Sequence, residues 1–276
     1  MNEYLKLVNF EWNRFMKMYL ILIGVTIILQ VTGVIFESKL YIKRAGDVIY
    51  GDMVSKEEFL LDYGPMSFES IMNSIWVYGS IGICIVTLII YVFFIWYRDW
   101  FGKNTFIYRL LTLPTARINI YFAKATALFL LVLGLVSLQI ILLPIGNRIF
   151  QMLVPVDFRM DITTDVIIES GYLTILFPNT FKDFLIHYGT GFIAVLIVFT
   201  AILFERSYQL KGILFGGIYC AVALTALFSS MLATAFIGVQ YLYPEEQVLL
   251  QLMLSVLVMT ISILTSRLLL NKKVKV

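Results

Sequence analysis

The chain has 276 residues, of which 60% are hydrophobic and 14% are charged. A soluble globular domain carries about 25% charged residues, so the composition excludes a soluble domain and predicts a membrane-embedded protein. The net charge of +3 is small. The two cysteines, Cys84 and Cys220, lie inside apolar runs, so we expect them to form neither a disulfide nor a metal site.

Residues 1–17 predict an amphipathic helix that lies in the plane of the membrane interface. Apolar side chains recur at three- and four-residue spacing at Leu5, Val8, Trp12 and Phe15. Polar side chains fall on the opposite side at Lys6, Asn9, Asn13 and Lys17. Such a helix places its aromatic residue at headgroup depth and its basic residues near anionic lipid. The alternative is a simple N-terminal extension of the first membrane span.

Six apolar stretches are long enough to cross the hydrocarbon core, which takes about 20 residues. In the third stretch, Pro144 and Gly146 are expected to end the helix. Before the fourth, Thr180 and Asp183 predict a capped helix start. The six predicted spans are 18–36, about 75–96, 125–143, 184–204, 213–237 and 248–266.

The distribution of Lys and Arg predicts that both termini are cytoplasmic. With the N-terminus inside, the inner segments hold 14 basic residues and the outer segments hold 7, whereas the acids number 4 inside and 14 outside. No Asp or Glu is left for the middle of a span, which disfavours an ion-coupled carrier. Milder polar residues such as Gln30 and Gln139 are predicted to form interhelical hydrogen bonds.

The inner segment Arg98–Lys124 is longer than a turn requires and predicts a short cytoplasmic helix. Helical patterns stand on both sides of Pro114, which cannot continue the first of them. Five basic residues against one acid suit a cytosolic partner. The alternative is that this segment has no partner. Cytoplasmic segments of membrane proteins carry an excess of Lys and Arg in any case, and this bias alone would explain its positive charge.

This segment also carries Asp99 and Gly102, then Leu110-Leu111-x-Leu113-Pro114-x-x-Arg117, then Lys124 at the start of the third span. With the N-terminal helix and six spans, it resembles the permease subunits of type-2 class ATP-binding-cassette (ABC) exporters. In that family the segment forms a coupling helix seated on a separate ATPase subunit. The resemblance implies an ATPase-coupling loop with these residues: Asp99, Gly102, Arg109, Leu113, Pro114, Arg117 and Lys124. Asp99 stands where the family usually has a glutamate, and the outer segment between spans five and six is short.

The fifth span is rich in small residues, which let membrane helices approach closely. Gly212 and Gly216 form a Gly-x-x-x-Gly pair, and Gly217 with Ala221 continues the spacing. Packing within one subunit is one interpretation, and the family resemblance implies the other, a subunit interface.

Two outer segments, residues 37–70 and 147–186, are the largest parts outside the spans. The sequence around Ala45-Gly46 is compatible with a small hairpin. These segments are expected to cap the helix bundle, with recognition of an extracellular molecule as the alternative.

The resemblance implies a single transmembrane permease domain over residues 1–276, an all-α polytopic fold in a bacterial plasma membrane. Its partners would be an ABC ATPase subunit, a second identical or different permease subunit and membrane lipid, with no nucleic acid. The expected cargo is peptide or drug-like. No Gly-x-x-x-x-Gly-Lys-Ser/Thr loop occurs, so ATP and Mg²⁺ are expected on the partner, and no catalytic residue, cofactor or metal on this chain.

Two other function classes stay open at this point. A non-catalytic sensor or immunity protein would bind an extracellular ligand through the outer segments and would need no ATPase. An integral-membrane enzyme is disfavoured, because Glu245-Glu246 is the only paired carboxylate near a span and the only histidine, His187, is distant in sequence.

Overall fold

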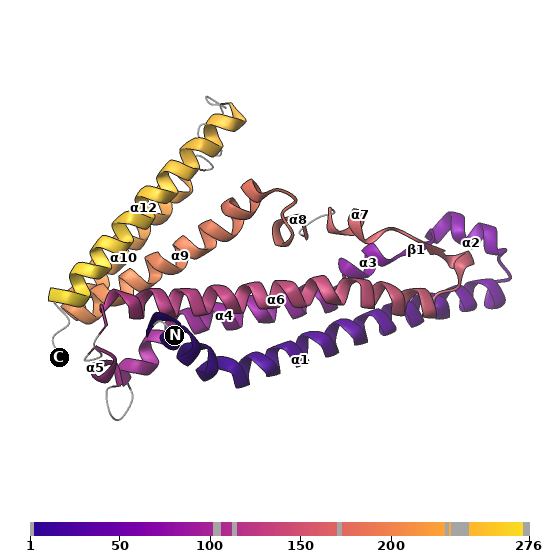
Figure 1. Cartoon of the computed structure of the whole chain (residues 1–276). Helices are drawn as coiled ribbons and strands as arrows, with labels where there is room; N and C mark the ends of the chain where they lie inside the picture. The colour runs from indigo at the N-terminus through magenta and orange to yellow at the C-terminus, as the bar shows by residue number, and fades with distance from the viewer. Residues whose placement is uncertain are drawn as a thin grey trace. The chain divides into compact units, whose positions relative to one another are not determined.

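The computed structural model describes residues 3–101, 106–111, 115–169, 173–229, 232 and 243–272, and these are almost entirely helical (Figure 1). Six helices are long and apolar enough to cross a membrane, as the sequence predicts. Five of the predicted spans fall entirely within one of them, and the fifth, 213–237, begins in a helix that ends at Leu227. They are α1 (Glu3–Gly46), α4 (Ile75–Phe101), α6 (Ile118–Leu153), α9 (Phe181–Tyr208), α10 (Leu210–Leu227) and α12 (Pro244–Lys272).

The chain divides into two compact units. Unit 1 contains Met1–Arg14, Leu88–Leu130 and Pro178–Val276. Unit 2 contains Phe15–Thr87 and Leu131–Phe177. Helices α1, α4 and α6 therefore contribute residues to both units.

In unit 1, α9 and α10 form a tight helical hairpin on which α12 packs. Gln209 makes the turn in a left-handed backbone conformation, with φ of 56°. The predicted cap of α9 is confirmed, because Thr180 Oγ1 accepts a hydrogen bond from the Asp183 backbone N–H at 3.1 Å. The apolar core between these helices consists of Ile193, Ile197, Ala223, Leu227 and Val258.

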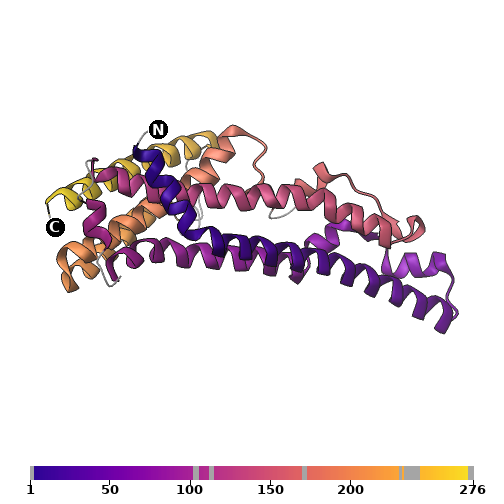
Figure 2. The same ribbon diagram turned by 60° about the horizontal axis from the view of Figure 1, so that its bottom comes forward.

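A short helix, α5 (Phe106–Leu111), also belongs to unit 1 and lies between α4 and α6 in the chain. Figures 1 and 2 both show α5 and the described end of α12 at the same end of this unit, where α9 turns into α10. At this end, Arg117, which follows α5 in the chain, contacts α12: its Nη1 donates to the carbonyl of Leu270 at 2.8 Å. That bond satisfies a carbonyl in the last turn of α12, which has no partner within its own helix.

Unit 2 holds the longer parts of α1 and α6. With 44 residues, α1 is about 66 Å long at 1.5 Å per residue, roughly twice the thickness of the hydrocarbon core. Short elements follow each of these helices in the chain. After α1 come π-helix η1 (Asp47–Gly51), α2 (Lys56–Tyr63), β1 (Met66–Ser67) and α3 (Phe68–Met72). After α6 come 3-10 helix η2 (Val156–Phe158), β2 (Arg159–Met160), α7 (Thr164–Ile168) and α8 (Leu173–Leu176).

The two predicted outer segments pack together into one folded cap in unit 2. Strand β1 pairs in parallel with β2, with Met66 opposite Arg159, and Lys56 Nζ lies 2.7 Å from Asp157 Oδ2. Their shared core combines aliphatic and aromatic side chains, including the fully buried Phe150 and the nearly fully buried Phe68. The two segments therefore fold together, and their role as a cap on the membrane helices stays a prediction.

The predicted interhelical hydrogen bonds are confirmed in unit 2. Gln30 Nε2 of α1 donates to Ser80 Oγ of α4 at 2.9 Å and to Gln139 Oε1 of α6 at 2.8 Å. All three side chains are buried. An amide buried among apolar side chains needs such partners, because water cannot supply them there.

Two predictions about helix ends were wrong. The hairpin over Ala45-Gly46 does not form, because α1 continues to Gly46 and η1 follows directly. Pro144 and Gly146 do not end α6, which runs to Leu153. A proline costs a membrane-type helix one backbone hydrogen bond without necessarily breaking it. Gly146 provides space, since a Cβ there would lie 2.9 Å from Cζ of Phe68.

Helix α1 is continuous from Glu3 to Gly46, so residues 3–17 are not separated from the first span by a break in the helix. The predicted polar side of this segment is exposed at Lys6, Asn9, Asn13 and Lys17. Its placement in the plane of a membrane stays a prediction.

Candidate functional site

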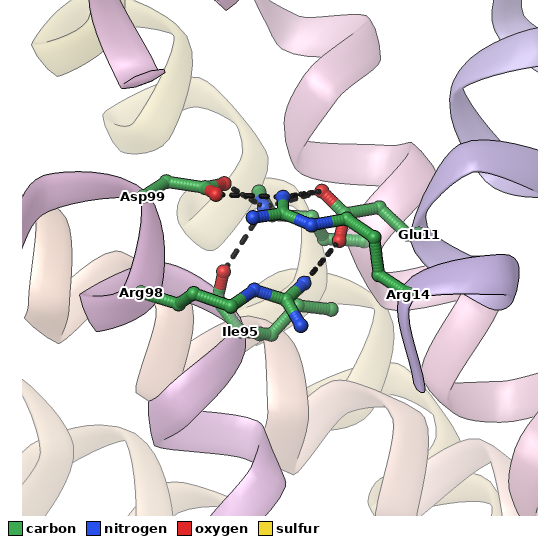
Figure 3. A network of polar contacts seen from close by, with 6 residues as sticks. Glu11, Arg14, Ile95, Arg98 and Asp99 are labelled. Carbon is green, nitrogen blue, oxygen red and sulfur yellow. Dashed lines mark hydrogen bonds and ion pairs between the residues drawn. The ribbon is translucent and has the colours of Figure 1, made fainter. Parts of the chain in front are cut away.

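Five charged side chains from α1, α4 and α6 meet inside unit 1 (Figure 3). We call them the ion network: Glu11, Arg14, Arg98, Asp99 and Lys124. Two of them, Asp99 and Lys124, were predicted as coupling-loop residues from the family resemblance. The structure brings these two into direct contact.

Lys124 is the centre of the ion network. Its Nζ donates to Asp99 Oδ2 at 2.5 Å, to Glu11 Oε1 at 2.6 Å and to the carbonyl of Ile95 at 3.0 Å. An ammonium has three N–H donors, so each donor has an acceptor. The side chain is fully buried, and this complete set of partners is what allows a charge to lie there.

The two arginines complete the network from its partly exposed edge. Arg14 Nη1 donates to Asp99 Oδ1 at 2.7 Å, and Arg98 Nη2 donates to Glu11 Oε2 at 3.0 Å. Each carboxylate is therefore hydrogen-bonded to Lys124 and to one arginine, and Glu11 Oε1 also lies 3.8 Å from Arg14 Nη1. Asp99 lies in the last turn of α4, where the helix dipole disfavours an anion, so its burial depends on these cations.

The ion network fixes geometry more than it adds stability. Moving ions out of water costs several kcal/mol each, and their mutual attraction repays this cost only when every group is paired. A set of apolar side chains would often be as stable or more stable. Buried charged side chains of this kind in a membrane protein therefore indicate a candidate functional site.

Aromatic stacking connects the ion network to α5. The rings of Phe10 in α1 and Phe106 in α5 stack at 5.6 Å between centres. The guanidinium carbon of Arg14 lies 5.0 Å from the centre of Phe10 and 5.2 Å from that of Phe106. Arg14 thus contacts both the ring of α5 and the carboxylate of Asp99.

An apolar pocket opens between α5 and the first turns of α1. Its volume is about 380 Å³, within the range of small-molecule pockets. Leu7 and Phe10 line it from α1, and Phe106 and Leu110 line it from α5. Glu3 and Lys6 contribute one charge of each sign to the same lining.

Two other predicted coupling-loop residues, Arg109 and Arg117, are described and lie elsewhere. Arg109 is exposed on α5, and Arg117 is engaged by α12 as described above. Gly102, Leu113 and Pro114 lie outside the described residues. The coupling role of the whole set stays a prediction.

The small residues of the fifth span divide into two pairs. A Cβ added at Gly212 would lie 2.1 Å from the carbonyl oxygen of Phe204, and one at Gly216 would lie 2.9 Å from that of Ala201. These two glycines therefore let α10 pack against α9 within the chain. Gly217 and Ala221 are exposed, and a contact between them and a second subunit stays a prediction.

Sequence reasoning missed Glu11, Arg14 and Arg98 as members of the network. A signal was present for Glu11, which lies three residues after Val8 and four before Phe15. Val8 and Phe15 are both buried, and Glu11 lies between them on the same helix face at 3% exposure. A charged residue on an apolar face calls for an opposite charge from another element. The sequence pattern placed Trp12 on that face instead.

Comparison of the chain with protein-family models, curated proteins and solved structures finds no match. Within residues 3–101, 106–111, 115–169, 173–229, 232 and 243–272, no group of three or more His, Cys, Asp or Glu side chains is arranged to hold a metal ion. The described site offers a fixed set of ion pairs and an apolar pocket beside a short helix.

Proposed function

We propose that this chain is the membrane-spanning permease subunit of an ATP-driven ABC transporter, coupled to a separate ATPase subunit. The observation that supports it most is the ion network, because its members lie on both sides of α5 in the chain. Asp99 lies in the last turn of α4, which precedes α5, and Lys124 lies near the start of α6, which follows it. Their contact ties the two ends of the inner segment together.

The proposed mechanism is mechanical. A partner that displaces α5 acts on a segment whose two ends are joined by buried, fully paired charges. These ion pairs resist separation, because breaking one of them leaves an uncompensated buried charge. The displacement is then carried into the long helices α4 and α6 rather than absorbed by the loop. Two permease subunits would in this way alternate between inward-facing and outward-facing states and export a peptide or drug-like cargo.

The apolar pocket beside α5 indicates which surface of this chain would contact the ATPase. Phe106 and Leu110 of α5 form part of the apolar lining of the pocket. Arg109 is exposed on the same short helix. An ATPase surface that combines an apolar side chain with acidic groups would fit this combination.

Co-purification tests the proposal. The detergent-solubilised chain is purified from its native cells with its partners, and these are identified by mass spectrometry. We expect a stoichiometric cassette ATPase with the native chain and at least tenfold less with Arg109→Glu. Arg148→Glu is the matched control, because Arg148 is exposed on α6 in unit 2 and should retain the ATPase. A native chain that brings down no ATPase would overturn the proposal.

A membrane sensor or immunity protein is the second candidate. The folded cap of unit 2 favours it, because a packed core gives the two outer segments a defined surface. Such a protein needs no ATPase, so Arg109→Glu would leave its activity unchanged. A cell-protection or signalling assay that tolerates Arg109→Glu and fails on cap substitutions would favour this candidate.

A further inference from the structure

The end of α9 carries a guanidinium enclosed by aromatic rings of α4. The Cζ atom of Arg206 lies 4.5 Å from the ring centre of Phe101, 4.9 Å from that of Tyr97 and 5.7 Å from that of Trp100. These cation–π contacts hold the charge in place on the surface of unit 1. The side chain keeps 19% of its surface exposed, so part of the guanidinium stays accessible.

Two N–H donors in this aromatic enclosure have no acceptor in the described structure. They are Nε of Arg206 and Nε1 of Trp100, and both atoms are buried. A buried donor without an acceptor costs about as much free energy as a lost hydrogen bond. Their presence on neighbouring side chains indicates that an acceptor from outside the chain belongs there.

The nearest acid does not fill this role. Glu205 accepts a hydrogen bond from the hydroxyl of Tyr97, and its Oε1 lies 3.5 Å from Nη2 of Arg206. The pair therefore engages one terminal nitrogen of the guanidinium and leaves Nε unmatched. Lys211 lies five residues after Arg206 in the chain, is exposed in the first turn of α10 and carries a second positive charge.

The surface around the enclosure is apolar. Phe101 is 72% exposed and Leu210 is 84% exposed, and the exposed Ile213 and Leu214 follow in α10. A guanidinium framed by aromatic rings and exposed aliphatic side chains is typical of the headgroup layer of a membrane. A water-soluble anion would make no use of these apolar side chains.

We infer that Arg206 and Trp100 bind the phosphate group of an anionic phospholipid. Both N–H groups are covered in this structure, so the surrounding rings shift when the lipid binds. Phosphate oxygens then accept from Nε of Arg206 and Nε1 of Trp100, and the arginine bond is charge-assisted. The acyl chains lie along Phe101 and Leu210. Lys211 gives preference to lipids with a net negative headgroup. This inference depends on membrane embedding and not on the proposed transport function.

Native mass spectrometry of the purified, delipidated full chain measures its affinity for added lipids. The probes are phosphatidylglycerol, phosphatidylcholine and inorganic phosphate. We expect phosphatidylglycerol to bind about fivefold tighter than phosphatidylcholine, as one additional basic residue near the headgroup provides. Inorganic phosphate at millimolar concentration should not displace it. Displacement would overturn the assignment to a lipid, and equal binding of the two lipids would overturn the anionic preference.

Two substitutions test the residues. Trp100→Phe keeps an aromatic ring and removes the N–H, and Arg206→Lys keeps the charge and removes Nε with its planar fork. Each should weaken phosphatidylglycerol binding about tenfold, the effect of one lost charge-assisted hydrogen bond. The matched controls Trp76→Phe and Arg148→Lys lie in unit 2 and should bind as the native chain does. Trp100→Phe is the milder change and decides the test if Arg206→Lys does not fold. Native affinity in Trp100→Phe would overturn the proposal.

Discussion

Replacing Lys124 by methionine is expected to lower the free energy of unfolding by about 3 kcal/mol. Methionine fills nearly the same space but removes the charge and its contacts to Asp99 and Glu11. Breaking a buried ion pair costs about 3–5 kcal/mol, because the remaining charge is left uncompensated. The lower end applies here. Asp99 keeps Arg14 at 2.7 Å, and Glu11 keeps Arg98 at 3.0 Å.

The measurement is unfolding of the detergent-solubilised chain by titration with sodium dodecyl sulfate, followed by far-ultraviolet circular dichroism. Lys182→Met is the matched control, because Lys182 is exposed in the first turn of α9 and should change the free energy by less than about 0.5 kcal/mol. If Lys124→Met unfolds within 0.5 kcal/mol of the native chain, Lys124 is not the buried centre of the ion network and the reasoning is refuted.

Two further predictions concern packing and use the same unfolding assay. Gly212→Ala should destabilise the chain by about 2 kcal/mol, the typical cost of overpacking, because the new methyl group meets the backbone of α9. Gly217→Ala should be nearly neutral, since nothing lies within 4 Å of its added Cβ; equal effects at the two glycines would contradict the α9–α10 packing. Phe59→Ala in the cap of unit 2 should cost about 3–5 kcal/mol because this ring is fully buried. Phe181→Ala is the exposed control, and a neutral Phe59→Ala would contradict the packed cap.

The membrane helices could be predicted from the sequence because lipid leaves the backbone little choice. A spanning segment must satisfy its own hydrogen bonds, so about 20 apolar residues in a row indicate a helix. The same argument predicted the hydrogen bonds of Gln30, because a buried amide must find a partner. Thr180 could be identified as a cap because the geometry of capping is local.

The extensions of the helices beyond the spans could not be predicted in this way. Past Phe36, α1 carries the charged residues Glu37, Lys39, Lys43 and Arg44, and hydropathy no longer separates helix from loop there. The cap depends on contacts between residues distant in sequence, such as Met66 with Arg159 and Phe68 with Phe150. A single sequence contains no direct signal for such pairs.

The candidate site was predictable in part. The family resemblance identified Asp99 and Lys124 as members of one loop, but it did not predict that they contact each other. Their shared partner Glu11 lies 113 residues from Lys124 in the chain, so only the folded structure brings them together. The charge of Glu11 on a buried helix face was the one local signal that such a partner must exist.

The central claim is that α5 contacts a cassette ATPase, and cross-linking in living cells tests it most directly. Arg109 is replaced by the photoreactive residue benzoylphenylalanine, with the same replacement at Arg148 as the control. Irradiation followed by mass spectrometry identifies the captured protein. The account predicts a cassette ATPase attached at position 109 and none at position 148. Capture of an ATPase at neither position, from cells in which the chain is folded and inserted, would contradict it.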